Sequence, residues 1–135
     1  MEFDRSPFVE AVIGAAIEVH SRLGPGLLES AYEKCLMREF FLRGIQAQRQ
    51  RQLPLDYKGT FVDCGYRVDF LVEKAVVVEL KTVERVLPIH KSQVLTYLRL
   101  LEIRYGLILN FNVQLMKQGI HSIICPMLRG APHPK

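Results

Sequence analysis

The stretch YRVDFLVEKAVVVELK, Tyr66–Lys81, decides the fold, because it contains two apolar strand-like runs joined by a polar turn at Glu73 and Lys74. A hairpin centred on Lys74 places Asp69 opposite Glu79, since both positions are equally distant from the centre. Charged residues are rare inside such runs, because removing a charge from water is costly unless it is paired or binds a metal. The charges in this hairpin therefore indicate either an ion pair or a functional site.

The alternation of side chains along a strand puts Lys81 on the face of Glu79, and Arg67 on the face of Asp69. Two carboxylates and a lysine on one side of a sheet indicate a site for Mg²⁺ or Mn²⁺, because these hard cations prefer oxygen ligands. The lysine could orient or deprotonate a water molecule, or stabilise charge on a phosphorane-like transition state. A cross-strand salt bridge at a sheet edge is the alternative, and the apolar residues around the three charges favour the site.

The chain before the hairpin predicts two helices. Apolar residues at helical spacing indicate a helix over residues 8–22, with Ser6 as its N-cap and Pro7 in its first turn. The Gly-Pro-Gly segment at 24–26 ends this helix, and a second helix is expected over residues 27–43.

The other expected elements predict a mixed sheet flanked by helices. The third strand, AVVVELKTV, is almost continuously apolar, which favours a central position covered on both faces. The element order is α-α-β-β-β-α-β-β, typical of an α/β fold. In chain order, we expect an extended segment over 45–58 interrupted by Pro54, a turn at 58–59, a strand from 60 to 72 bent at Gly65, a strand over 75–83, a helix over 88–102, and strands over 105–112 and 121–127.

Composition is that of an ordinary soluble globular protein. The 135 residues fit one domain, with a core over 8–125 and a loose tail over 126–135. The net charge of +4 is compatible with a polyanionic partner and does not identify one. Three widely spaced cysteines favour free thiols, and no apolar run reaches the ~18 residues of a membrane span. We therefore expect a cytoplasmic protein that does not bind membranes.

Two further sets of polar residues are candidates for the same site. Gln93 and Tyr97 lie one helical turn apart, where an amide and a phenol could bind a phosphate or a base. The alternative is that Tyr97 belongs to the core and Gln93 to the surface. Glu29 follows the glycine-rich turn at the start of a helix, where an acid that complements the helix macrodipole is a sufficient explanation.

Several motifs together resemble a known family. The segment GLLESAYE, at 26–33, has the form G-x-x-E-x-x-Y and follows LGPG. The hairpin VDFLV…VVELK, the helix PIHxxQxxxY and the strand end NFN come after it. From residue 8 to residue 125 the chain resembles the GxxExxY proteins, a family assigned to the PD-(D/E)XK nuclease superfamily, near the exonuclease-like branch that has a Q-x-x-x-Y motif.

This resemblance implies a restriction-endonuclease-like αβββαβ core with an extra N-terminal helix. It assigns Asp69 and Glu79 as metal-binding carboxylates and Lys81 as the catalytic lysine. Leu80 would contribute a backbone carbonyl to the metal. Glu29 would be the acid from the first core helix and would converge with Asp69 and Glu79 to hold one or two metal ions.

The resemblance also implies a substrate-binding set and a cofactor. Gln93 and Tyr97 match the motif on the helix after the third strand, and Arg67 is a further candidate for phosphate contact. The expected cofactor is Mg²⁺ or Mn²⁺. The proline of the superfamily's proline-aspartate pair is replaced by Val68, a change that an extended backbone tolerates.

The sequence therefore predicts a metal-dependent nuclease that hydrolyses phosphodiester bonds of nucleic acid, with DNA as the expected substrate. The short chain leaves little room for a recognition domain, so a homodimer or a protein partner is expected to assist. One alternative is a non-catalytic nucleic-acid-binding or regulatory module that retains the fold. Another is a structural or interaction protein whose hairpin charges form only salt bridges.

Overall fold

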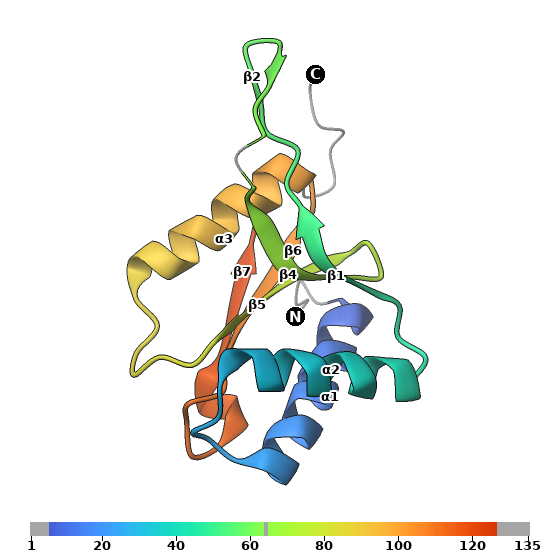
Figure 1. Ribbon diagram of the computed structural model, residues 1–135, viewed down its shortest axis with the longest axis vertical. Coiled ribbons are helices and arrows are strands. Elements are labelled where there is room, and N and C mark those ends of the chain that lie inside the picture. Colours follow the sequence, from blue (N-terminus) through green and yellow to red (C-terminus); the bar gives the residue numbers. More distant parts are fainter. Residues whose placement is uncertain (1–5, 64, 127–135) are drawn as a thin grey trace, which may run out of the picture.

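The computed structural model describes residues 6–63 and 65–126, which form a central sheet with helices on both faces (Figure 1). In chain order the elements are α1 (Pro7–Leu23), α2 (Glu29–Leu42), β1 (Ala47–Gln52), β2 (Asp56–Tyr57), β3 (Thr60–Phe61), β4 (Arg67–Val72), β5 (Val76–Lys81), α3 (Pro88–Leu101), β6 (Tyr105–Asn110), η1 (Met116–Gly119) and β7 (Ile120–Ile124). The expected mixed sheet, with an N-terminal helix preceding the core elements, is confirmed.

The main sheet has the strand order β1-β4-β5-β6-β7. Strands β5 and β6 are parallel and are connected through α3, whereas the other neighbours are antiparallel. The middle strand, β5, is buried along Val76–Leu80, which confirms the prediction of a strand covered on both faces. Its carboxyl end is the position where the candidate charges lie.

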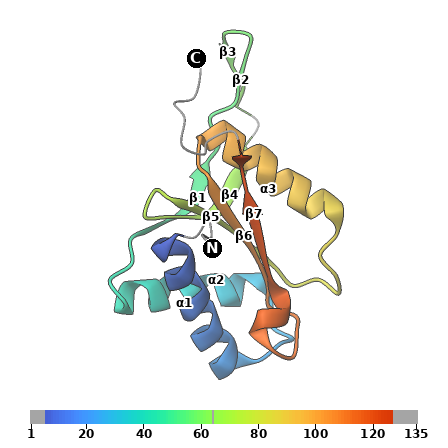
Figure 2. The same cartoon turned by 180° about the vertical axis from the view of Figure 1, so that it is seen from behind.

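Two apolar cores hold the layers together. The larger core packs α1 and α2 on one face of the sheet, and the smaller core packs α3 on the other (Figure 2). In the larger core, the Phe40 ring meets the Phe70 ring edge-on at 5.4 Å, and the Tyr32 ring stacks on Phe111 at 4.5 Å. These contacts anchor α2 against the sheet.

The starts of the first two helices follow from local chemistry. The Ser6 hydroxyl accepts a hydrogen bond from the Phe8 N–H at 3.1 Å, and Pro7 occupies the first turn, as predicted. Helix α2 begins at Glu29, two residues later than expected. Gly24 and Gly26 have φ of +72° and +101°, and Leu28 is still extended, so the chain does not become helical before Glu29.

The prediction of one strand from residue 60 to residue 72 is wrong. The chain instead forms a separate two-stranded hairpin, β2–β3, and resumes as β4 at Arg67. Its turn is Lys58–Gly59, as expected, and both residues have positive φ, as a two-residue hairpin turn requires. This hairpin projects from the body of the molecule (Figure 1). Strands of two residues are too short to produce a periodic signal in the sequence.

Some expectations concern residues outside the described ranges. Cys64 and residues 127–135, most of the expected tail, are among them. Of the described cysteines, Cys35 is exposed, Cys125 is buried, and both are free. None of the helices within the described ranges combines the length and apolar character needed to cross a membrane.

Candidate active site

The β4–β5 hairpin has the register that the sequence predicted. Phe70 pairs with Val78, so the hairpin is centred on Lys74. The turn residues Glu73 and Lys74 both have φ of +53°. This register fixes which side chains of the two strands can meet.

Beyond the Phe70–Val78 pair, hydrogen bonds from the main chain to side chains replace the main-chain pairing between β4 and β5. The Asp69 N–H donates a hydrogen bond to Glu79 Oε2 at 3.0 Å. The Leu80 N–H donates in return to Asp69 Oδ2 at 2.8 Å. Each carboxylate is therefore held by the main chain of the opposite strand, at the point where the ladder pairs end.

Burial and mutual repulsion disfavour the charged forms of these acids. Glu79 is only 8% exposed, and its burial, with the nearby Asp69 charge, raises its pKa from 4.5 to about 8. Burial also raises the pKa of Asp69, although the hydrogen bond from the Leu80 N–H opposes this rise. The half-buried Lys81 opposes the rise for both acids. The cluster therefore has an excess of carboxylates over cations.

Glu29 joins this cluster from the first turn of α2. Partial burial raises the pKa of Glu29, and repulsion by Asp69 adds to that rise. The G-x-x-E-x-x-Y motif explains its position. The Tyr32 hydroxyl donates to the Gly24 carbonyl and accepts from the Leu27 N–H at 3.2 Å, which fixes the turn before the helix. The motif tyrosine thus positions the motif glutamate.

Carboxylates are suitable ligands for a divalent cation, but the arrangement of these acids in the structure does not bring them together around one ion. Within residues 6–63 and 65–126, no three or more His, Cys, Asp or Glu side chains form a group that could hold one ion. The expected convergence of Glu29, Asp69 and Glu79 on one ion is therefore not seen. Carboxylates are nevertheless the ligands that Mg²⁺ and Mn²⁺ prefer, and a cation would relieve the repulsion that raises their pKa values.

Gln50 is a residue of the site that sequence reasoning missed. Its side-chain amide donates to Asp69 Oδ1 at 3.2 Å and to Glu33 Oε2 at 3.1 Å, which links the sheet to α2. Gln50 has φ of +55°, in the left-handed region that non-glycine residues rarely adopt. The polar segment AQRQRQ, 47–52, contains no signal that distinguishes this glutamine from its neighbours.

Arg67 lies at the rim of the site. It is exposed, and its Nη1 donates to the main-chain carbonyl of Gln50 at 3.4 Å. Arg67 therefore contacts the main chain of Gln50, and this hydrogen bond stabilises the left-handed backbone conformation beside Asp69.

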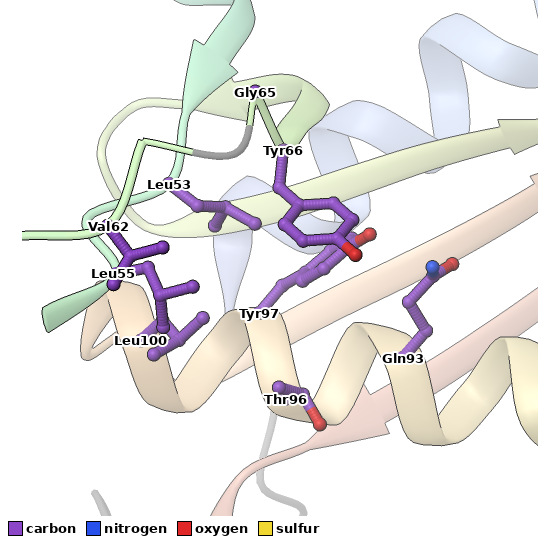
Figure 3. Close-up of a pocket in the computed structure, with 9 residues that line it drawn as sticks. All are labelled: Leu53, Leu55, Val62, Gly65, Tyr66, Gln93, Thr96, Tyr97 and Leu100. Atoms are coloured by element: carbon purple, nitrogen blue, oxygen red, sulfur yellow. The ribbon is translucent and has the colours of Figure 1, made fainter. Parts of the chain in front are cut away.

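Helix α3 places Gln93 and Tyr97 next to the acids. Tyr97 is 8% exposed, whereas Gln93 is exposed and hydrogen-bonded to the Tyr97 side chain. Burial raises the pKa of Tyr97, and the nearby Glu79 charge contributes further. Both residues line a cavity of about 270 Å³ (Figure 3). The pair thus connects the carboxylate cluster with a cavity.

The fold and the acid–lysine cluster together define a nuclease-like domain. A model of the PD-(D/E)XK nuclease superfamily matches residues 6–123, and the chain belongs to this superfamily. Its mixed sheet with flanking helices is consistent with the restriction-endonuclease-like fold. Comparison with curated proteins and with solved structures found no match. Members of the superfamily are generally nucleases and typically use divalent metal ions.

Proposed function

We propose that this protein is a metal-dependent nuclease that hydrolyses phosphodiester bonds, with DNA as its substrate and Mg²⁺ or Mn²⁺ as its cofactor. Within the superfamily, the motifs of residues 26–33 and 79–81 further support assignment to the GxxExxY family.

The observation that carries this proposal is a pair of reciprocal hydrogen bonds between β4 and β5, from the Asp69 N–H to the Glu79 carboxylate and from the Leu80 N–H to the Asp69 carboxylate. Two acids are kept partly buried at one sheet end by hydrogen bonds from the opposing strands, beside a lysine. Burying like charges together destabilises a fold. A structural role alone would be served better by apolar residues, so the arrangement favours a site that binds a cation and a phosphate.

In this proposal, Asp69, Glu79, the Leu80 carbonyl and Glu29 hold the cation, which supplies Lewis-acid stabilisation of charge on the phosphodiester when bound. Gln50 orients Asp69 through the hydrogen bond to Oδ1. Asp69 and Glu79 also contribute the electrostatic field that acts on the attacking water.

Lys81 positions or deprotonates that water, or stabilises negative charge as it develops on the phosphate. Gln93 and Tyr97 contact the substrate from α3, and Arg67 contributes a phosphate contact at the rim. The described residues contain no recognised base-reading motif, so we expect little sequence preference.

The test is incubation of the purified protein with linear, nicked and single-stranded DNA and with RNA, with and without Mn²⁺. The wild type is compared with Lys81→Ala and with Lys117→Ala, a matched control that removes an exposed lysine of η1. We expect cleavage that requires Mn²⁺, is lost in the first variant and is retained in the second.

Cleavage that survives Lys81→Ala would assign the activity to another site or to a contaminant. Binding of nucleic acid without cleavage of any substrate would instead favour the non-catalytic module. The choice among the four substrates also decides whether DNA is the preferred nucleic acid.

A further inference from the structure

A cavity of about 270 Å³ lies between α3 and the base of the β2–β3 hairpin, close to the lower limit of ordinary ligand pockets at about 300 Å³. Segments on either side of the hairpin supply one wall, and α3 supplies the other. The residues that define its two ends are Leu53, Leu55, Val62, Tyr66, Tyr97 and Leu100. A compact ligand, rather than a duplex, matches this size.

The cavity has an apolar end and a polar end. Figure 3 shows Leu55, Val62 and Leu100 gathered on one side, while the hydroxyls of Tyr66 and Tyr97 point toward the side of Gln93. Among the described residues that line it, none is a lysine, arginine, aspartate or glutamate. The bound group is therefore uncharged over most of its surface and has polar atoms at one edge.

The polar end lies toward the carboxylate cluster. The Tyr97 phenol interacts electrostatically with Glu79 and with Asp69, the two acids whose carboxylates accept main-chain hydrogen bonds at the end of the β4–β5 ladder. A ligand that reached from the cavity to this cluster would combine an uncharged body with a phosphate group. A nucleotide has this composition.

We propose that the cavity binds one unpaired nucleobase of the substrate strand, next to the phosphodiester that the carboxylate cluster acts on. This inference rests on the proposed nuclease function. Tyr66 is 54% exposed and offers a ring face for stacking. Beyond the hydrogen bond between Gln93 and the Tyr97 side chain, the Gln93 amide and the two tyrosine hydroxyls have further donors and acceptors for the base edge or the sugar.

The adjoining β2–β3 hairpin provides further contacts for the same nucleic-acid strand. Tyr57 is 63% exposed and Phe61 59% exposed, and the Lys58 ammonium lies 5.4 Å from the Tyr57 ring centroid. Surfaces that bind single strands combine aromatic rings for stacking with cations for the backbone. A base inside a duplex must be unpaired before it can enter such a cavity, so single strands and frayed ends are the favoured substrates.

The test compares two single strands of equal length and charge, a fluorescently labelled oligothymidylate and the same backbone without bases. Binding is measured by anisotropy in EDTA, so no cleavage is needed for the readout. The wild type should bind the strand with bases about fivefold to a hundredfold more tightly, which is the range that stacking of a base supports.

Tyr66→Ala and the cavity-filling Val62→Trp should lower this ratio severalfold, whereas Tyr66→Phe should keep it because the ring remains. Phe41→Ala is the matched control, since Phe41 is an exposed aromatic residue of α2 outside the cavity. Thermal unfolding of each variant verifies that it is folded.

Equal affinity of the wild type for the two strands, or no binding of either, would overturn the inference. A ratio that Phe41→Ala lowers as much as Tyr66→Ala would also overturn it. If the protein cleaves DNA but binds both strands equally, only the base pocket fails. If base-dependent binding is found without cleavage of any substrate, the nuclease proposal fails instead.

Discussion

Two buried polar side chains, Asn110 and Glu79, lie near the same end of the adjacent parallel strands β6 and β5, and their environments differ. Asn110 is 3% exposed, and both the oxygen and the nitrogen of its amide are hydrogen-bonded. Its Oδ1 accepts from the N–H groups of Val83 and Asn112 at 3.1 and 3.2 Å, and its Nδ2 donates to the Val83 carbonyl at 2.9 Å. Asn110 thus ties the segment after β5 to the end of β6.

Glu79 is almost as buried but is not stabilised in its charged form. It accepts a hydrogen bond from the Asp69 N–H, yet repulsion by Asp69 and Glu29 adds to the cost of burying its charge. The contrast teaches that a buried polar group with hydrogen-bond partners at both its donor and its acceptor atoms has a structural role. A buried acid in a cluster of like charges points to a ligand that brings positive charge.

The largest expected effect is on catalysis. Glu79→Gln should lower the cleavage rate by about 10²–10⁴-fold, because it replaces a carboxyl group that ionises to bind the cation with a neutral amide of the same shape. The rate is measured with Mn²⁺ on the substrate that the wild type cleaves best. Glu39→Gln, which changes an acid of α2 that pairs with Arg43 on the helix surface, should remain close to the wild type. Equal losses of cleavage rate in both variants would show that Glu79 has no special role in cleavage.

The second effect is on the pH dependence of stability without metal. Glu79 titrates near 4.5 in the unfolded chain and near 8 in the folded protein. Between these values the folded state holds a proton that the unfolded state has lost. The free energy of unfolding should therefore fall, by on the order of a few kcal/mol, as the pH rises from about 4.5 to about 8.

Urea unfolding in EDTA at a series of pH values measures this fall, and Glu79→Gln should flatten it. Above pH 8 the variant should be more stable than the wild type. A wild-type curve that rises over this range, or an identical slope in the variant, would contradict the assignment of Glu79 as the acid with the raised pKa.

The third effect has the opposite sign to the stabilisation expected for Glu79→Gln. Asn110→Ala should lower the free energy of unfolding by about 2 kcal/mol at every pH, because it removes a buried amide and its short hydrogen bonds to the partly buried main-chain groups of Val83. Urea unfolding measures it, with Gln114→Ala, which changes an exposed amide of the same segment, as the control. A neutral Asn110→Ala variant would show that this asparagine does not fix the segment.

The smallest effect is expected at Gln50. Gln50→Gly should change the free energy of unfolding by no more than about 1 kcal/mol, because glycine relieves the positive φ while the exposed hydrogen bonds are lost. The cleavage rate should fall although the free energy of unfolding changes little, since Asp69 loses the contact that orients it. Gln50→Asn, with a shorter amide, tests whether the reach of the side chain matters. Unchanged cleavage in both variants would exclude a positioning role.

The sequence predicted the parts of the site that depend on regular geometry. The pairing of Asp69 with Glu79 follows from the symmetry of a hairpin about Lys74, and the shared face of Gln93 and Tyr97 follows from helical spacing. These inferences need only strand alternation and helical period. The resemblance to a nuclease superfamily then gave the acids their expected roles.

The remaining features depend on contacts between distant segments. Gln50 adopts a left-handed backbone that its neighbours in 47–52 do not predict, and its partners come from α2 and β4. The β2–β3 hairpin has strands too short for periodicity, so the cavity at its base could not be foreseen. The position of Glu29 relative to the two sheet acids depends on where α2 packs, which the motif alone does not determine.

The most direct test of the central claim is isothermal titration of Mn²⁺ into the wild type, Asp69→Asn, Glu79→Gln and Glu39→Gln at one pH above 8, where the acids are charged. The account predicts saturable binding by the wild type and by Glu39→Gln, and loss of binding in Asp69→Asn and Glu79→Gln. No binding by the wild type, or equal binding by all four proteins, would contradict the claim that the Asp69–Glu79 pair is a cation site.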